Sequence, residues 1–275
     1  MLNTFSIDYS IKAVAKTDRG NLRPNNEDNF AVCTVPCKAD KKCHYQLYDH
    51  LPPHGAILVI ADGMGGAKAG ELASEIAIES IIHQFQELIL LPENESEIAS
   101  LLKNIILHAH EEIVAYSDVH KQFKGMGTTV VLAWILEGML YLTWCGDSRC
   151  YLLQKNNIQL LTEDHSKVWE LVKKGEINPE QARTHPQAHI ITQALGDKKL
   201  IPQPSFKAMP ITHQNRILLC SDGLNSMLLD TDIAQTINNQ EDNLDNIANL
   251  LIEKAKDAGG QDNITVILAD FIAKK

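Results

Sequence analysis

The chain has 275 residues, of which 44% are hydrophobic and 22% are charged, so a disordered or fibrous protein is excluded and a full hydrophobic core is expected. Its 25 Lys and Arg residues against 35 Asp and Glu residues give a formal net charge of −10, which argues against a nucleic-acid-binding protein with a broad basic surface. No apolar run approaches the roughly 20 residues that cross a bilayer, and residues 1–10 lack a secretory signal, so we expect a cytoplasmic protein without membrane association and with reduced cysteines.

The first half of the chain predicts three strands followed by two helices. We expect strands at residues 10–16, 30–35 and 56–61, and the last is a continuous apolar run that is typical of a strand buried on both faces. Apolar residues recur at three- and four-residue steps over 72–88 and 98–113, which predicts two helices with one buried face each. The break at 91–94 separates them, and Ser96 is the expected N-cap of the second helix.

The second half predicts a β-meander and then a further strand–helix–strand unit. Strands are expected at 128–136, 139–145, 149–154 and 158–162, each pair joined by a short turn. Residues 164–196 are polar and interrupted by Gly and Pro, which indicates short helices and loop. A strand at 216–220, helices from Asp230 and Asn243 that end before Gly259-Gly260, and a strand at 264–271 complete the chain. Adjacent meander strands favour antiparallel sheets covered by helices.

Acidic side chains stand at the ends of five of these predicted strands. They are Glu27 with Asp28, Asp62, Asp147, Asp222 and Asp262. A carboxylate near a core is costly unless a positive charge meets it, and the candidate partners Arg23 and Arg149 are too few. A divalent cation is the simplest compensation. Because the candidate ligands are all oxygens, a hard ion such as Mg²⁺ or Mn²⁺ is favoured over Zn²⁺.

Three other interpretations of these residues compete with a metal centre. A single Asp-Gly pair is more often only a turn, and it is the coincidence of several acids at equivalent strand ends that indicates an ion. The glycine-rich residues 63–66 lack the patterns of a dinucleotide loop or a P-loop. Cys33, Cys37, Cys43 and His44 match no zinc spacing, so we interpret the cysteines as incidental thiols.

Seven short motifs follow one another between Val14 and Phe271. They are Thr17-Asp18-Arg19-Gly20 with Arg23-Pro24-Asn25-Asn26-Glu27-Asp28, Ala61-Asp62-Gly63-Met64-Gly65-Gly66, Gly125-Met126-Gly127-Thr128-Thr129, Cys145-Gly146-Asp147-Ser148-Arg149, Leu161-Thr162-Glu163-Asp164-His165-Ser166, Ser221-Asp222-Gly223-Leu224 and Gly260-Gln261-Asp262-Asn263-Ile264-Thr265. In content and order this set resembles the protein phosphatase type 2C family, the metal-dependent Ser/Thr phosphatases, in its bacterial form. One such motif would be weak evidence, but the ordered set covers almost the whole chain and is very specific.

The resemblance implies a fold. It predicts one catalytic domain over residues 1–275, with an α+β fold built as a four-layer αββα sandwich: two antiparallel β-sheets flanked by antiparallel helix pairs. The metal centre would lie at one edge of the sandwich. Residues 164–196 would form a flap-like segment beside it, and residues 37–53 would be an insertion.

The resemblance also assigns roles to the strand-end residues. Two ions, Mn²⁺ or Mg²⁺, would share the centre with a more weakly held third ion, and a metal-bridging hydroxide would attack the phosphorus. Arg23 would grip the substrate phosphate through its planar fork. Asp62 would serve both of the first two ions, and Gly63 would supply a carbonyl oxygen. Asp222 and Asp262 would complete the site of the first ion, Asp28 or its neighbour Glu27 would serve the second, and Asp147 with Asp222 would hold the third.

Three positions depart from the family pattern. Met64 stands where many eukaryotic relatives have a histidine that is a candidate general acid, so the leaving group would be protonated from elsewhere. Ala188 and Gln193 stand in the flap-like segment where bacterial relatives often have arginine. These two changes would weaken or redirect contacts with protein substrates.

The leading interpretation is therefore a phosphatase that hydrolyses phosphoserine and phosphothreonine on proteins, which would be substrates of a Ser/Thr kinase, and that acts as a monomer. A binding module without turnover is a second hypothesis, and it would require a lost metal acid, but none is missing. A phosphatase of small phosphoesters is a third, and the altered flap keeps it open.

Overall fold

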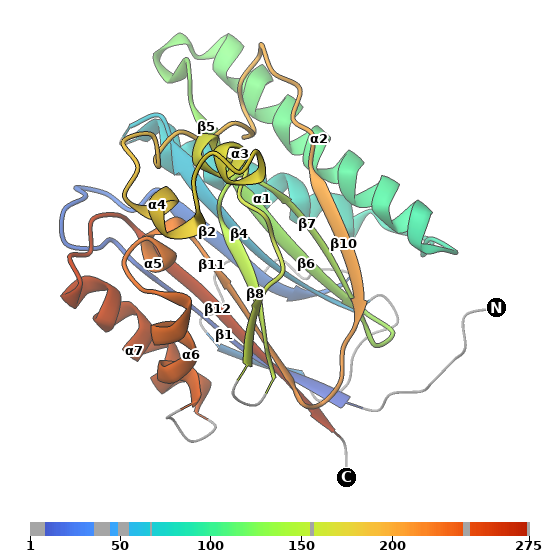
Figure 1. Cartoon of the computed structure of the whole chain (residues 1–275). Helices are drawn as coiled ribbons and strands as arrows, with labels where there is room; N and C mark the ends of the chain where they lie inside the picture. Colours follow the sequence, from blue (N-terminus) through green and yellow to red (C-terminus); the bar gives the residue numbers. More distant parts are fainter. Residues whose placement is uncertain are drawn as a thin grey trace.

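Two antiparallel β-sheets pack face to face at the centre of the computed structural model, which describes residues 9–35, 45–48, 55–66, 68–154, 157–238 and 243–273 (Figure 1). The first sheet has the strand order β3-β1-β12-β11-β8-β9, with bounds Tyr45–Tyr48, Tyr9–Asp18, Ile264–Ala273, Asn215–Cys220, Arg149–Gln154 and Asn157–Leu160. The second has the order β10-β7-β6-β4-β2, with bounds Ser205–Pro210, Met139–Cys145, Val130–Leu136, Ala56–Met64 and Asp28–Thr34, and the short β5 (Gly127–Thr128) pairs with β4.

Helices cover the outer face of each sheet (Figure 1). The pair α1 (Lys68–Gln86) and α2 (Glu95–Val119) packs on the second sheet, and the pair α6 (Asp230–Asn238) and α7 (Leu244–Asp257) packs on the first. Three short helices lie near one end of the sandwich: α3 (Lys167–Lys173), α4 (Pro179–Arg183) and α5 (Asp222–Asn225). A single 3₁₀ turn, Lys121–Phe123, follows α2.

Strand β4 shows how the sequence produces these layers. Its apolar run alternates between two cores, because successive side chains of a strand point to opposite faces. Leu58 and Ile60 lie in the core between the two sheets, whereas Ile57 and Val59 lie in the core under α1 and α2. All four are completely buried, and each contributes about 1.5–3 kcal/mol of hydrophobic stabilisation. A third core fills the space between the first sheet and α6 and α7.

The expected four-layer αββα fold is confirmed, with local corrections. The N-cap of α2 is Asn94 and not Ser96: the Asn94 side chain accepts a hydrogen bond from the Glu97 amide at 3.0 Å, while the Glu97 carboxylate bonds back to the Asn94 side chain at 2.7 Å. Strand β4 runs on through Asp62 to Met64, because β5 pairs with its last residues. Strands β3 and β10 and the one-turn helix α5 were not anticipated, since their short segments show no clear periodicity.

The cysteines divide into two groups. Cys145, Cys150 and Cys220 are free and buried, as the reduced-thiol expectation requires. Cys33 is instead disulfide-bonded, which corrects that expectation at this position. The residues Cys37, Cys43 and His44 of the discarded soft-metal hypothesis lie outside the described residues, as does most of the insertion 37–53.

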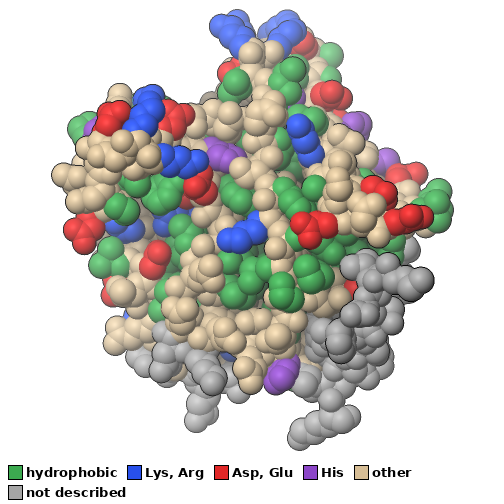
Figure 2. Space-filling view, turned by 45° about the vertical axis from the view of Figure 1, so that its right-hand side comes forward, with side chains coloured by type: hydrophobic (Ala, Val, Ile, Leu, Met, Phe, Trp, Pro, Cys, Tyr) green, Lys and Arg blue, Asp and Glu red, His purple; other side chains and the backbone are tan. Residues whose placement is uncertain are grey.

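The described surface mixes charge types. On the face drawn in Figure 2, Lys and Arg side chains stand singly or in small groups among Asp, Glu and hydrophobic side chains. Within the described ranges, none of the helices combines the length and apolar character needed to cross a membrane.

Candidate metal centre

Two of the strand-end acids face each other across one pair of strands. Asp28 is the first residue of β2 and stands directly opposite Asp62 in the antiparallel register with β4. Directly opposed residues of an antiparallel pair have Cβ atoms only about 4.5–5.5 Å apart, where like charges repel. The fold therefore brings these two carboxylates together although 34 positions, from 28 to 62, separate them in the sequence.

Only one of the two carboxylate oxygens of Asp28 is hydrogen-bonded. Its Oδ2 accepts hydrogen bonds from the Thr265 hydroxyl at 2.6 Å and the Ser221 hydroxyl at 2.7 Å, whereas its Oδ1 is buried without a hydrogen-bond partner. Burial raises the pKa of Asp28 to about 7, the two hydroxyl donors oppose this rise, and the charges of Asp222 and Asp262 add to it. One oxygen is thus fixed by the protein and the other is left for a positive partner.

Asp62 is fixed through its backbone. Its carbonyl oxygen accepts hydrogen bonds from the Thr129 amide and the Thr128 hydroxyl, both at 2.9 Å, and its amide donates to the Thr129 hydroxyl at 3.2 Å. Burial raises its pKa well above the ordinary value, and the neighbouring charge of Asp28 is the next cause, followed by those of Asp222, Asp147 and Asp262. Asp62 is therefore the side chain on which the fields of all the other acids converge.

Gly63 is required by close packing. A Cβ at this position would lie 2.1 Å from the Gly70 carbonyl oxygen and 2.6 Å from that of Glu27. Only a glycine lets the end of β4 approach the first turn of α1 and the segment before β2 at the same time.

Asp147 and Asp222 reach the same region from the turn that joins the two sheets and from the end of a strand in the first sheet, respectively. Asp147 lies in the turn that leads from β7 into β8, and Asp222 begins α5 directly after β11. The Oδ1 atoms of both are buried without a hydrogen-bond partner. Burial and the charge of Asp222 raise the pKa of Asp147 well above its usual range, and burial with the charge of Asp262 raises the pKa of Asp222 to about 6.

Asp262 is partly exposed and is already paired with an arginine. Its Oδ2 accepts a hydrogen bond from Arg23 Nη2 at 2.6 Å, and its Oδ1 accepts one from the Asn263 amide at 2.8 Å. The side chains of Arg23 and Asp262 are 50% and 29% exposed, so this is a solvent-accessible ion pair of small net value. Arg23 therefore stands at the open side of the acids, turned toward Asp262.

The donor set fits a hard dication. Three buried carboxylate oxygens without partners, from Asp28, Asp147 and Asp222, are the signature of groups that need a cation, because an uncompensated buried charge is costly. In the described part of the chain, no three His, Cys, Asp or Glu side chains lie close enough together to form a complete metal site. The buried, unpartnered oxygens of Asp28, Asp147 and Asp222 are nevertheless the hard donors that a dication requires.

Glu27 and Asp28 occupy different surroundings. Asp28 lies among the other acids, whereas Glu27 Oε2 lies against α1, where it is 1.8 Å from the place a Cβ of Gly70 would take. The Glu27 carbonyl oxygen accepts hydrogen bonds from the Ser74 hydroxyl at 2.6 Å and the Gly63 amide at 3.2 Å. This placement favours Asp28 over Glu27 as the acid nearest to an ion.

Sequence reasoning missed the neutral residues that hold the acids. Ser221 and Thr265 orient Asp28, and Thr129 links Asp62 to the Asp147 turn through a 2.7 Å contact with the Ser148 hydroxyl. Asn263 accepts from the Glu27 amide at 2.7 Å and donates to the carbonyls of Arg19 and Asn25. All of these lie inside the motifs already singled out, but only Ser148, Ser221 and Asn263 adjoin an acid in the sequence, so Thr129 and Thr265 carried no such signal.

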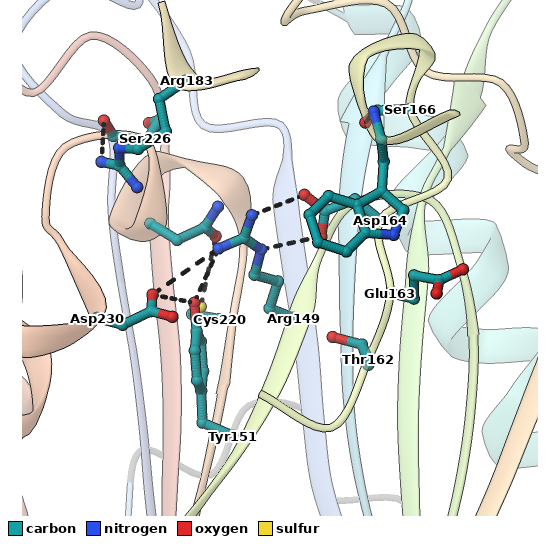
Figure 3. Close-up of polar contacts among 12 residues, drawn as sticks. Arg149, Tyr151, Thr162, Glu163, Asp164, Ser166, Arg183, Cys220, Ser226 and Asp230 are labelled. Atoms are coloured by element: carbon teal, nitrogen blue, oxygen red, sulfur yellow. Dashed lines mark hydrogen bonds and ion pairs between the residues drawn. The ribbon is translucent and has the colours of Figure 1, made fainter. Parts of the chain in front are cut away.

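The other candidate arginine, Arg149 at the start of β8, is bonded to the flap-like segment. Arg149 makes a bidentate pair with Asp164, at 2.9 and 2.7 Å, and donates to the Tyr151 hydroxyl at 3.1 Å (Figure 3). Tyr151 in turn donates to Asp230 at 3.0 Å. Arg149 thus ties the flap-like segment and α6 to the strand that follows the Asp147 turn.

Ala188 and Gln193, the two unusual residues of the flap-like segment, make no hydrogen bond to the acids within the described residues. Ala188 lines a cavity beside the centre, and Gln193 accepts a hydrogen bond from the Gln203 amide at 3.0 Å.

Comparisons with known proteins point to one family. The family model described as "Protein phosphatase 2C" matches residues 43–258. The serine/threonine phosphatase stp of Listeria monocytogenes serotype 4b is 38% identical over 255 residues, which are 93% of this chain and 94% of that protein. The crystal structure of the serine/threonine phosphatase Stp1 from Staphylococcus aureus superposes with a TM-score of 0.82 at 32% identity and covers 94% of each chain. The catalytic domain of the serine/threonine protein phosphatase PstP, solved in complex with two manganese ions, gives a TM-score of 0.76 at 30% identity and covers 96% of this chain and 99% of that one.

Proposed function

Because this chain belongs to the protein phosphatase 2C family, we propose that it is a metal-dependent phosphatase that hydrolyses phosphoserine and phosphothreonine in proteins through a hydroxide shared by two metal ions. The observation that carries the proposal is the group of buried carboxylate oxygens without hydrogen-bond partners, contributed by strand ends of both sheets. The relatives are named serine/threonine phosphatases, and one was solved with two manganese ions, so Mn²⁺ or Mg²⁺ is the expected cofactor here.

Most of the site residues would be metal ligands, and Arg23 would bind the substrate phosphate. Asp62 and the Gly63 carbonyl would serve both ions, Asp222 and Asp262 would complete one site, and Asp28 would serve the other. Asp147 with Asp222 would hold a weaker third ion. When bound, such dications lower the pKa of coordinated water and neutralise charge on phosphoryl oxygens.

Other residues of the chain orient the metal ligands and the substrate phosphate. Ser221 and Thr265 hold one oxygen of Asp28 so that the other stays directed toward the neighbouring acids. Arg23 lies at the exposed side and would exchange its single bond to Asp262 for a two-pronged contact with the substrate phosphate, as the ion takes over Asp262. Arg149, the other arginine singled out beside the acids, is committed to a bidentate pair with Asp164.

A substitution at Asp62 tests the proposal. Asp62→Asn keeps the size of the side chain but removes the charge on which the fields of the other acids converge, so Mn²⁺-dependent hydrolysis of a phosphothreonine peptide and of p-nitrophenyl phosphate should fall to background. Unchanged circular dichroism and thermal unfolding would show that the fold persists. A chelator should abolish the wild-type rate. Turnover in Asp62→Asn equal to that of the wild type would refute the assignment.

We further propose that the chain acts as a single catalytic domain on proteins phosphorylated by a Ser/Thr kinase. Against the binding-module hypothesis stands the full set of acids at positions 28, 62, 147, 222 and 262. Comparing rates on phosphopeptides and on small phosphate monoesters separates the protein phosphatase from the small-ester hypothesis.

A further inference from the structure

His110 is a buried histidine to which the proposed mechanism gives no role. It lies on the buried face of α2, and only 7% of the residue is exposed. Its Nδ1 accepts a hydrogen bond from the amide of Gly196 at 3.0 Å, and Gly196 is itself buried and lies 86 residues further along the chain. One side chain of α2 therefore holds the backbone of a distant segment.

This hydrogen bond fixes the protonation state of the ring. An amide N–H can only donate, so Nδ1 must be unprotonated and the proton of the neutral imidazole lies on Nε2. Burial lowers the pKa of His110 below its ordinary value, against the opposing charges of Glu111 in the same helix and Asp197 in the segment beyond Gly196. The residues that a Cβ of Gly196 would meet carry no charge, and they are Met126, Ile113 and Gly127. The ring is therefore a neutral acceptor at pH 7.

From Gly196 the contacts lead on to the strand that carries Asp62. Leu195, directly before Gly196, forms an isolated β-bridge with Thr128 of β5. The Leu195 amide donates to the Thr128 carbonyl at 2.9 Å, and the Thr128 amide donates to the Leu195 carbonyl at 3.1 Å. The Thr128 hydroxyl donates to the Asp62 carbonyl at 2.9 Å. His110, the 195–196 backbone, β5 and the end of β4 thus form one continuous series of contacts.

The two backbone segments in this series touch each other directly. A Cβ at Gly196 would lie 2.6 Å from the Met126 carbonyl oxygen, and a Cβ at Gly127 would lie 2.7 Å from the Leu195 carbonyl oxygen. Gly196 also has a φ of +99°, which favours glycine. Because neither glycine has a side chain that could interlock with the opposite segment, hydrogen bonds decide the relative position of the two backbones.

A second tether joins the same segment to α2, but it is much more exposed. Lys198 pairs with Asp118, and the two side chains are 68% and 43% exposed, so the pair contributes little and is screened by salt. The bond to His110 is buried instead, and its loss leaves the Gly196 amide inside the protein without an acceptor, which is costly. Of the two tethers, His110 is therefore the one that determines where the segment lies.

We propose that His110 is a positioning residue for the phosphatase reaction: as a neutral acceptor it holds the 195–196 backbone against β5, and through β5 it fixes the end of β4 that carries Asp62. This inference rests on the proposed function. Since His110 acts through a metal ligand and not through contacts with a protein substrate, its effect should be the same for every phosphate ester. An imidazolium has no acceptor nitrogen, so protonation of His110 breaks the bond and loosens the strand end.

Three substitutions separate an acceptor role of His110 from the filling of space. Asn places its Oδ1 where His has Nδ1, whereas Gln places its oxygen one bond further out and Leu has no acceptor. Hydrogen exchange of the Gly196 amide, measured by NMR on metal-free protein, should be about three- to tenfold faster in His110→Leu and His110→Gln than in the wild type. His110→Asn should keep the wild-type exchange rate.

The consequence for the metal centre is measured with Mn²⁺. In His110→Leu, the Kd for Mn²⁺ from calorimetry should rise about threefold or more, and kcat should fall by a similar factor for both a phosphothreonine peptide and p-nitrophenyl phosphate, with little change in KM. His110→Asn should restore all of these values. Asp118→Asn, which alters the exposed tether, and Ile106→Val, which weakens the buried face of α2 away from Gly196, are the controls and should keep the wild-type Kd.

The pH dependence isolates the imidazole, because asparagine does not titrate. The ratio of kcat in the wild type to kcat in His110→Asn should be close to one at about pH 7.5 and should fall as the pH decreases below about 6.5, the ordinary pKa of histidine. The carboxylates of the centre titrate in both proteins, so their effect cancels in this ratio.

The outcomes separate the positioning role from the proposed function. If the Gly196 amide exchanges at the wild-type rate in His110→Leu, if that variant keeps its Mn²⁺ affinity and kcat, or if His110→Asn fails to rescue them, the positioning role is refuted and the proposed function stands. Should His110→Leu and His110→Gln not fold, the pH dependence of the ratio between wild type and His110→Asn decides. If the wild type hydrolyses neither substrate with Mn²⁺, the proposed function fails, and hydrogen exchange with Mn²⁺ affinity still shows whether His110 positions the acids.

Discussion

The polar neighbours of an acid decide which of its oxygens is available to an ion. In Asp28 one oxygen is saturated by two hydroxyl donors and the other faces the remaining acids without a partner. A neutral hydroxyl can do this without neutralising the carboxylate, whereas a lysine or arginine in its place would compete with the ion. Asp62 is held through its backbone as well, because its carbonyl oxygen accepts hydrogen bonds from the Thr129 amide and the Thr128 hydroxyl.

Thr265→Val tests this role of the hydroxyl groups. The change keeps the shape of a fully buried side chain but removes the 2.6 Å bond to Asp28, and bonds to charged groups contribute about 1.5–3 kcal/mol. We expect the free energy of unfolding to fall by that amount in urea titrations, and Mn²⁺ to bind more weakly by calorimetry. The control is Thr143→Val, a buried threonine bonded to the Ser205 carbonyl, which should lose stability without losing Mn²⁺ affinity. Equal Mn²⁺ affinities in wild type and Thr265→Val would contradict the idea.

Arg23 is expected to act on substrate binding and hardly at all on stability. Arg23→Lys keeps the charge but loses the planar fork, so KM for a phosphothreonine peptide should rise about five- to thirtyfold with a smaller change in kcat. Because the pair with Asp262 is partly exposed, its loss should change the free energy of unfolding by less than about 1 kcal/mol. Arg19→Lys, in the same segment and exposed, serves as the control. An unaltered KM would show that another group holds the phosphate.

At the scale of elements, the centre depends on the close approach of β4 and α1. Gly63→Ala would place a methyl group 2.1 Å from the Gly70 carbonyl oxygen, so helix and strand must separate. Such overpacking costs about 1–3 kcal/mol, and the displaced end of β4 also carries Asp62, so activity should fall along with stability. Gly175→Ala is a fair comparison, since its backbone has a φ of +72° but no atoms within 4 Å, and it should reduce stability without reducing activity. Full activity in Gly63→Ala would contradict this packing argument.

The sequence predicted those elements whose periodicity or burial was strong. The predicted bounds of the strands at 139–145 and 149–154 agree with the structure, because turn residues flank short segments rich in leucine and aromatic side chains. β10 escaped detection because none of its residues is fully buried, so neither an apolar run nor a clean alternation marks it. The N-cap of α2 was misplaced by two residues, because Asn94 and Ser96 are both good caps and only the reciprocal bonds with Glu97 decide between them.

Candidate acids could be found from the sequence, but their contacts could not. That Asp62, Asp222 and Asp262 stand at strand ends follows from the hydrophobic pattern alone. That Arg23 pairs with Asp262, or that Asp28 is bonded to Ser221, depends on which strand ends share an edge, and separations of more than 190 residues leave no local signal for this.

At the scale of the whole molecule, the acid cluster exists because two sheets end at the same edge. Asp28 and Asp62 come from one sheet, Asp222 and Asp262 from the other, and Asp147 from the turn that joins them. Each sheet is held by its own helix pair and by the shared core, and this large buried area offsets the repulsion among five carboxylates. The site thus stores unfavourable electrostatic energy that either protons or metal ions can relieve.

The raised pKa values of the acids predict how the stability of the metal-free protein changes with pH. Folding raises the pKa of Asp28 to about 7 and that of Asp222 to about 6, through burial and neighbouring acids, from about 3.9 in an unfolded chain. Between about pH 4 and pH 7 the folded chain therefore binds more protons than the unfolded chain, so the stability of chelator-treated protein should fall as the pH rises through this window. Its Tm should be lower at about pH 7.5 than at about pH 5.5.

Mn²⁺ should reverse that trend, because the ion replaces the protons. At a free concentration of one hundred times its Kd the ion adds about 2.7 kcal/mol to the free energy of unfolding. At one fixed free Mn²⁺ concentration the gain should be larger at pH 7.5, where the ligands are ionised and Kd is lower, than at pH 5.5, where protons compete for the same oxygens. Differential scanning calorimetry gives the Tm under all four conditions: at each pH value with chelator and with Mn²⁺. The double variant Asp28→Asn/Asp222→Asn removes two of the raised carboxyl groups and should flatten both the pH dependence and the response to Mn²⁺. If the chelator-treated wild type is instead more stable at pH 7.5 than at pH 5.5, the acids do not form the repulsive cluster from which the metal centre is inferred.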